Sequence, residues 1–140
     1  MALIDFCRTE VVTIPLGTSI AKSAKLMKQK NVGSVVIIDD SKPVGILTDR
    51  DIAVRVVAEG KDPESTKVSE VMTENPETLN EDLGLFQALE RMKEVGVRRF
   101  PIVNDRGELV GIITLDDVLY ILGKEMSDVA TILKKESPRL

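Results

Sequence analysis

The phrase Val-Gly-Ile-x-Thr-x-x-Asp occurs twice in this chain of 140 residues. Each copy joins an apolar run of strand type to an amphipathic stretch. The threonines, Thr48 and Thr114, can each cap a helix with the side-chain oxygen, and the unpaired N–H groups at such a helix start favour an anion. The aspartates, Asp51 and Asp117, are placed one turn later to accept hydrogen bonds from hydroxyl groups. One copy alone predicts an ordinary capped helix, whereas two copies together favour nucleotide sites, with phosphate at the N–H groups and a ribose diol at the carboxylate.

The repetition extends over nearly the whole chain. A shift of 65 positions aligns Leu3 with Val68, and one extra residue in the second hairpin turn changes the shift to 66, which aligns Val44 with Val110. Self-similarity at a fixed spacing indicates repeated structural units. The predicted units are residues 3–62 and residues 68–127, followed by a C-terminal helical tail at 128–140.

Each unit is predicted to have the order β-α-β-β-α. In the first unit, an extended stretch at 11–14 precedes a helix capped by Ser19, which is followed by a hairpin and a closing helix from Ile52 to Glu59. Gly33 and Gly96 are expected near the ends of the two first helices. A unit of about 60 residues is marginally stable alone. The expected fold is therefore α+β, an α/β-type repeat whose two units pack as a pseudo-two-fold pair.

The end of the chain, from Lys124 to Leu140, has apolar residues at helical spacing, Met126, Val129, Ile132 and Leu133. We expect this helix to lie back on the core, with a membrane-surface helix as the alternative. The last residues are expected to fray.

Composition excludes several classes of function. The chain has no histidine and one cysteine, Cys7, so it lacks the commonest general base, the commonest transition-metal ligand and any Ser-His-Asp arrangement. It also lacks glycine-rich phosphate-binding motifs. We therefore expect no enzyme activity, no catalytic residues and no metal site. The net charge of −4 and pI of about 5 disfavour a nucleic-acid surface.

The same composition bears on location. No apolar run approaches the ~20 residues of a membrane span, and the N-terminus lacks the features of a signal peptide. A single cysteine fits a reducing compartment. The expected location is cytoplasmic, without membrane attachment.

The order and spacing of these motifs resemble a tandem pair of CBS domains, the module named after cystathionine β-synthase. The resemblance covers nearly the whole chain. It rests on both Gly-Ile-x-Thr-x-x-Asp phrases and on the segments at 88–92 and 97–105. It implies a disc-like pair with packed sheets and a cleft at each side, where such pairs commonly bind AMP, ADP, ATP or S-adenosylmethionine. No cofactor is expected to be required.

The resemblance also implies roles for residues. The threonine of each phrase meets phosphate, the aspartate holds the ribose hydroxyls, and adenine lies at the start of the strand after the first helix. The threonine of the opening stretch borders the same cleft, and an arginine within the first phrase can meet phosphate. The implied ligand-binding residues are Thr13, Val32, Gly33, Ser34, Val35, Thr48, Arg50, Asp51, Thr78, Val97, Arg98, Arg99, Phe100, Pro101, Thr114 and Asp117.

The two copies are not equivalent. The family's proline stands at Pro101 in the second unit, whereas the first unit has Val36. Arg50 lies within the first phrase, while its counterpart is Asp116, which repels phosphate. Unequal affinity is therefore expected, with the larger contribution from Asp117, because the second copy is closer to the family pattern.

The predicted function is a non-catalytic ligand-sensing module that binds an adenosine-containing ligand and regulates a partner. The output is expected to lie with an effector protein. A homodimer is expected, because the helices after the two phrases carry many apolar residues: Ile52, Val56, Val57, Val118, Leu119 and Leu122. The alternative is a structural or protein-docking CBS pair with empty clefts, whose threonines and aspartates only cap helices.

Overall fold

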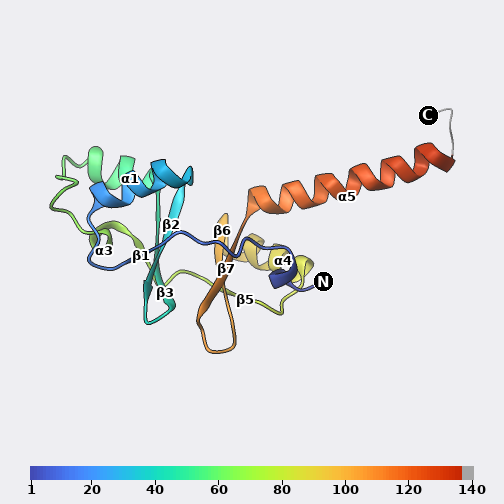
Figure 1. The fold of residues 1–140 in the computed structure, drawn as a ribbon, viewed down its shortest axis with the longest axis horizontal. Helices are drawn as coiled ribbons and strands as arrows, with labels where there is room; N and C mark the ends of the chain where they lie inside the picture. Colours follow the sequence, from blue (N-terminus) through green and yellow to red (C-terminus); the bar gives the residue numbers. More distant parts are fainter. Residues whose placement is uncertain (137–140) are drawn as a thin grey trace.

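The computed structural model describes residues 1–136 and consists of two lobes, each with one sheet and its own helices (Figure 1). The strands are β1 (Thr13–Pro15), β2 (Ser34–Asp39), β3 (Lys42–Thr48), β4 (Thr73–Glu74), β5 (Leu79–Asn80), β6 (Arg99–Val103) and β7 (Leu109–Thr114). The helices are a 3₁₀ turn, η1 (Leu3–Asp5), then α1 (Ile20–Lys30), α2 (Asp49–Ile52), a π-helical segment η2 (Ala53–Val57), α3 (Val68–Val71), α4 (Leu85–Val95) and α5 (Leu115–Glu136). This is the mixed α+β fold that the sequence predicts.

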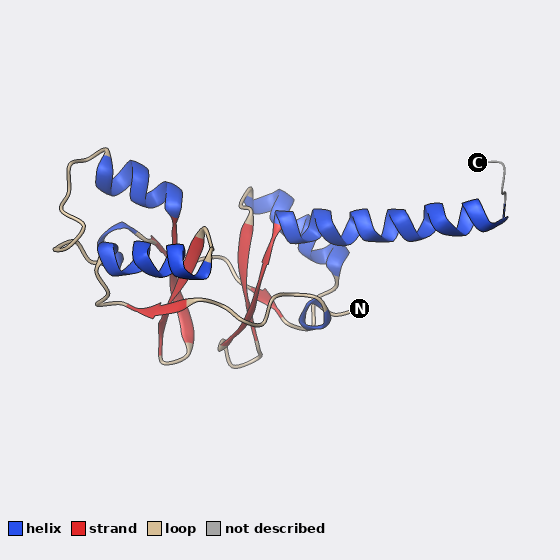
Figure 2. Ribbon diagram, turned by 45° about the horizontal axis from the view of Figure 1, so that its top comes forward, coloured by secondary structure: helices blue, strands red, loops and turns tan. Residues whose placement is uncertain are grey.

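The two sheets lie side by side between the helices of the two lobes (Figure 2). One has the order β1-β2-β3-β4 and the other β5-β6-β7. In both sheets the first strand runs parallel to the second, and the second is antiparallel to the third. Both therefore keep the strand order of the predicted repeat.

The first helix of the first unit begins after Ser19, as the sequence predicts, but it does not end at Gly33. Ser19 Oγ accepts a hydrogen bond from Lys22 N at 3.2 Å and caps α1. Helix α4 ends at Gly96 with φ of 74°, and α1 ends at Asn31 with φ of 52°. Asn31, rather than Gly33, takes the left-handed position, because asparagine tolerates this conformation. With the shift of 65, Asn31 is the repeat mate of Gly96.

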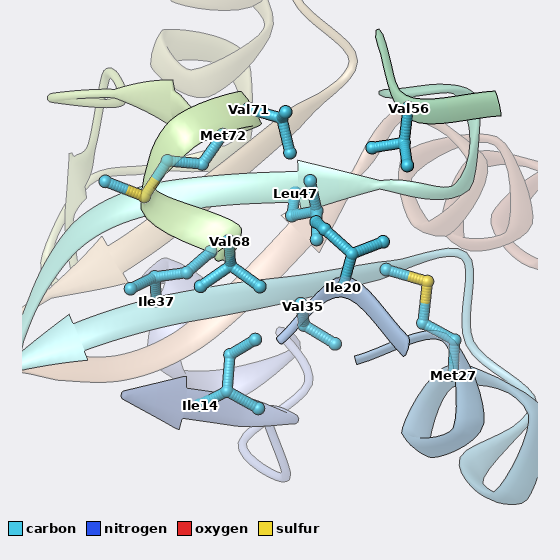
Figure 3. Packing of buried hydrophobic residues seen from close by; sticks show 10 residues of the cluster. All are labelled: Ile14, Ile20, Met27, Val35, Ile37, Leu47, Val56, Val68, Val71 and Met72. Carbon is cyan, nitrogen blue, oxygen red and sulfur yellow. The ribbon is translucent and has the colours of Figure 1, made fainter. Parts of the chain in front are cut away.

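Alternate residues of each strand face different cores. Val35, Ile37 and Leu47 pack under the helices of the first lobe (Figure 3), whereas Val36 and Ile46 face the other sheet and contact Ile112. This alternation follows from the two-residue period of a strand. The contact between the lobes is therefore made by the sheet faces opposite the helices.

The opening segments of the two repeats are exchanged in space. Leu3 is fully buried in the core of the second lobe, with Phe100 and Ile102. Its repeat mate Val68 is fully buried in the core of the first lobe, with Ile37. Each lobe thus contains one repeat without its opening segment, together with the opening segment of the other.

Each exchanged segment crosses the glycine of the repeated phrase. A Cβ atom on Gly111 would lie 2.6 Å from Cys7 Sγ and 2.9 Å from the Arg8 carbonyl oxygen. A Cβ atom on Gly45 would overlap the side chain of Met72, the repeat mate of Cys7. The glycines therefore permit the close approach that brings Arg8 and the segment after Met72 to the ends of the phrases.

The C-terminal helix does not lie back on the core. Helix α5 continues for 22 residues and extends away from the second lobe (Figures 1 and 2). Val118 is buried, but Met126 and Val129 are 69% and 51% exposed. The expected packing on the core is wrong because the chain makes no turn after Leu122 that could bring the tail back. Positions 137–140 of the predicted tail lie outside the described residues.

Candidate functional site

Both repeated phrases form the same hydrogen-bonded cap at the start of a helix. Thr48 Oγ1 accepts from Asp51 N at 3.1 Å, and Asp51 Oδ2 accepts from Thr48 N at 2.9 Å. Thr114 and Asp117 repeat both bonds at the same distances. The cap occupies one oxygen of each carboxylate, Oδ2, and leaves Oδ1 for another partner.

One cleft contains the second of these caps, and we call it the Thr114 cleft. It combines Thr114 of the second repeat with the start of β2 in the first repeat. Its lining residues are Arg8, Glu10, Val11, Val12, Asn31, Val32, Gly33, Ser34, Val36, Arg99, Ile112, Thr114 and Asp116.

A second cleft contains the first cap, and we call it the Thr48 cleft. It combines Thr48 of the first repeat with the start of β6 in the second. Its lining residues are Ile46, Thr48, Thr73, Pro76, Glu77, Val97, Arg98 and Arg99. Each cleft has a volume of about 190 Å³, and the two clefts differ in their lining.

The clefts join residues of different repeats. Each cleft is lined by the threonine of one phrase and by the start of a strand from the other repeat. The pseudo-two-fold packing of the sheets brings these residues together. Arg99 lines both clefts, and its Nη2 lies 3.5 Å from the position of a Cβ on Gly33. Gly33 therefore leaves room for a cation from the second lobe.

Several predicted site residues lie elsewhere. The side chains of Val35 and Phe100 are buried in the two lobe cores. Thr13 lines a different hollow with Thr9 and Ser41, and Thr78 lines one beside α4.

Four further predicted residues do not line either cleft. Arg50 is exposed and is outside the lining of both clefts. Pro101 is buried and pairs with Ile112 across β6 and β7. Asp51 and Asp117 are not lining residues, but each is hydrogen-bonded to the threonine that is.

Other lining residues escaped the sequence prediction. Ile46 lines the Thr48 cleft and Ile112 lines the Thr114 cleft. The two-residue period of a strand could have predicted both positions, since each isoleucine lies two residues before its threonine. Arg8 and Thr73 could not be placed from the sequence, because they reach the clefts only through the exchange of the opening segments. Their pairing partners are Ile112 and Ile46, in equivalent registers.

The carboxylates of the two caps have different neighbours. Asp117 Oδ1 accepts a hydrogen bond from Arg8 Nε at 2.9 Å, and Arg8 Nη2 lies 2.9 Å from the same oxygen as an ion pair. Asp51 Oδ1 lies 3.8 Å from Nε of Arg55, on the same helical segment. The outer oxygen of Asp117 is thus held by an arginine fork, whereas that of Asp51 has only a longer ion pair.

The described residues can also be compared with the requirements of a nucleophile, a metal site and a membrane span. Burial raises the pKa of the Cys7 thiol above its ordinary value, so this cysteine is a poor nucleophile at neutral pH. Within residues 1–136, no three His, Cys, Asp or Glu side chains gather as a metal site. No helix in this part of the chain is long and apolar enough to cross a membrane.

Similarity to known proteins agrees with this architecture. The family model of the CBS domain matches residues 3–58 and 68–124. The chain is 41% identical over 114 residues to the CBS domain-containing protein YhcV of Bacillus subtilis, covering 81% of this chain and 80% of that protein. It is 35% identical over 118 residues to an uncharacterized protein of Methanopyrus kandleri, covering 84% of this chain but 60% of that longer protein.

A solved structure shows the same pairing of units. The CBS domain pair of protein MJ0100, in complex with 5′-methylthioadenosine and S-adenosyl-L-methionine, superposes with a TM-score of 0.80 and 28% identity. The match covers 89% of this chain and 98% of that one. With two matched CBS domains and two clefts shared between them, this chain belongs to the CBS domain family, as a tandem pair.

Proposed function

We propose that this chain is a non-catalytic ligand-sensing module that binds an adenosine-containing ligand between its two CBS domains and regulates a partner. The candidate ligands are AMP, ADP, ATP and S-adenosylmethionine. The observation that carries the proposal is the repeated cap, in which a carboxylate uses one oxygen for the helix and keeps the other for a partner beside a cleft.

The chemistry of the clefts supports this ligand class. A ribose diol can donate two hydrogen bonds to a carboxylate oxygen, and charge-assisted bonds of this kind are strong. Apolar side chains, Ile46 and Val97 in one cleft and Val32 and Ile112 in the other, offer a surface for a flat base. Arginines in both linings favour an anionic group. The complex of the MJ0100 pair with two adenosine compounds adds support from a relative.

The partners that we propose include a second copy of this chain. Of the residues expected at a dimer interface, Val57, Leu119 and Leu122 are exposed, whereas Val56 and Val118 are buried in the lobe cores. We propose that a homodimer forms through the exposed face of α5 and that an effector protein receives the signal. The free Cys7 is consistent with a cytoplasmic setting.

The second candidate is a protein-docking CBS pair with empty clefts. It is favoured by the completeness of the caps, since Thr48 and Asp51 satisfy each other without any ligand. The two candidates differ in whether a small molecule stabilises the fold.

A thermal-shift panel separates them. AMP, ADP, ATP, S-adenosylmethionine, 5′-methylthioadenosine and NADH are tested, with GMP as the matched purine control and calorimetry on each hit. At a ligand concentration near 100 times the dissociation constant, binding adds about 2.7 kcal/mol of stability, which raises the melting temperature by several degrees. If no adenosine compound raises it in proportion to dose, the docking-pair function is favoured instead.

A further inference from the structure

Arg8 holds the one carboxylate oxygen that a ribose would need in the Thr114 cleft. Its Nε donates to Asp117 Oδ1 at 2.9 Å and its Nη2 lies 2.9 Å from the same oxygen as an ion pair, while Asp117 Oδ2 stays in the helix cap. Arg8 also lines this cleft, together with Arg99. A ribose diol that binds Asp117 must therefore displace the guanidinium.

The geometry of Arg8 makes this displacement local. Its backbone is fixed, because Arg8 N donates to Ile112 O at 3.1 Å and Ile112 N donates to Arg8 O at 2.9 Å. Its side chain is 65% exposed, whereas that of Asp117 is 12% exposed. The guanidinium can swing without moving the chain, and the carboxylate stays in place.

The Thr48 cleft lacks this arrangement. The repeat mate of Arg8 is Thr73, which pairs with Ile46 in the same register as Arg8 with Ile112. Thr73 lines its cleft with an uncharged side chain. The two clefts thus differ by an arginine at one structurally equivalent position.

We infer that Arg8 makes the Thr114 cleft selective for adenosine ligands that carry a 5′-phosphate. A ligand without phosphate must break the Arg8–Asp117 ion pair and offers the displaced guanidinium no phosphate in return. A nucleotide offers the displaced arginine a phosphate, which its planar fork matches. Glu10 and Asp116 line the same cleft and repel a phosphate, so Arg8 and Arg99 are needed to balance them.

This inference rests on the proposed function and deepens it to ligand selectivity at one cleft. AMP and 5′-methylthioadenosine form a matched probe pair, because they share adenine and the ribose diol and differ at the 5′ position. Methyl-labelled isoleucine NMR on the full chain reports each cleft separately, since Ile112 lines the Thr114 cleft and Ile46 the Thr48 cleft. The measured quantity is the ratio of the two dissociation constants at each cleft.

Arg8→Thr copies the equivalent position of the first repeat. At the Thr114 cleft it is expected to lower the preference for AMP over 5′-methylthioadenosine roughly tenfold or more, because only AMP loses a charge-assisted contact to its phosphate. Binding of 5′-methylthioadenosine should be unchanged or tighter, because Asp117 is freed. The Thr48 cleft should keep its parent ratio. Thr73→Arg, the reciprocal variant, should raise the preference for AMP at the Thr48 cleft.

The control is Arg106→Thr, which removes the same charge from an exposed hairpin turn outside both clefts. It should leave both ratios unchanged, and melting curves check that every variant folds. Equal weakening of both ligands by Arg8→Thr, or an unchanged ratio, overturns the inference while the proposed function stands. If the parent protein does not bind AMP at the Thr114 cleft, this inference is wrong, whereas the proposed function is wrong only if every adenosine compound of the thermal-shift panel fails.

Discussion

At the scale of single residues, the two cap aspartates carry the proposed ribose contact. The family pattern alone predicts a larger loss of nucleotide binding from Asp117→Ala than from Asp51→Ala. We expect the Arg8 ion pair to reverse that order, because removing Asp117 releases Arg8 for the phosphate. We expect Asp51→Ala to weaken AMP at the Thr48 cleft about ten- to a hundredfold, the cost of a charge-assisted hydrogen bond of about 1.5–3 kcal/mol. Asp117→Ala should weaken AMP at the Thr114 cleft by less, as measured by isoleucine methyl titrations.

The control for this prediction is a ligand rather than a variant. 2′-Deoxyadenosine monophosphate lacks one ribose hydroxyl, so it should bind the parent protein poorly and lose little more in either variant. Stability should fall by only ~1 kcal/mol in each, because Thr48 and Thr114 still cap their helices. If the deoxy ligand binds the parent as well as AMP does, the carboxylates serve the helix caps and not a ribose.

At the scale of elements, the exchange of opening segments predicts which lobe each segment stabilises. Leu3→Ala should destabilise the protein by about 2–5 kcal/mol, the usual cost of a cavity at a buried leucine. The damage should appear in the second lobe, although Leu3 belongs to the first repeat. Hydrogen exchange should therefore rise more in β6 and β7 than in β2 and β3. The repeat mate provides the matched test, since Val68→Ala should show the opposite distribution with a smaller loss. Faster exchange in β2 and β3 after Leu3→Ala contradicts the exchange of segments.

The opening segments also show how much of the fold and of the site the sequence could predict. Strand order, helix caps and the repeated phrase follow from local patterns: Ser19 before α1, and threonine followed by aspartate at each helix start. The lining threonines, Thr48 and Thr114, follow from those caps. The position of Arg8 could not be predicted, because nothing local in the sequence shows that the opening segment crosses Gly111 and pairs with Ile112. The contact with Asp117 spans 109 positions, and such long-range placement depends on the packing of the whole pair.

At the scale of the whole molecule, helix α5 has an apolar face that the rest of the chain does not cover. Apart from Tyr120 and Ile132, its exposed large apolar residues are spaced alternately by three and four positions: Leu119, Leu122, Met126, Val129 and Leu133. This spacing forms one stripe along a helix and is typical of a helix that packs against another. The start of the helix is acidic at Asp116 and its end is basic at Lys134 and Lys135. An antiparallel second copy would bring these opposite charges together, so the charge pattern favours this chain as its own partner.

We therefore expect at least a dimer at tens of micromolar concentration, measured by light scattering. Met126→Glu places a charge in the apolar stripe and should shift the mass to that of a monomer, because an interface does not tolerate an unpaired buried charge. Thr131→Glu is the matched control, since it adds the same charge on the opposite side of the helix and should leave the dimer intact. Lys134→Glu with Lys135→Glu should weaken association in a salt-dependent manner if the helices are antiparallel. A monomer mass for the parent protein, or equal effects of Met126→Glu and Thr131→Glu, would show that the stripe on α5 does not bind a second copy.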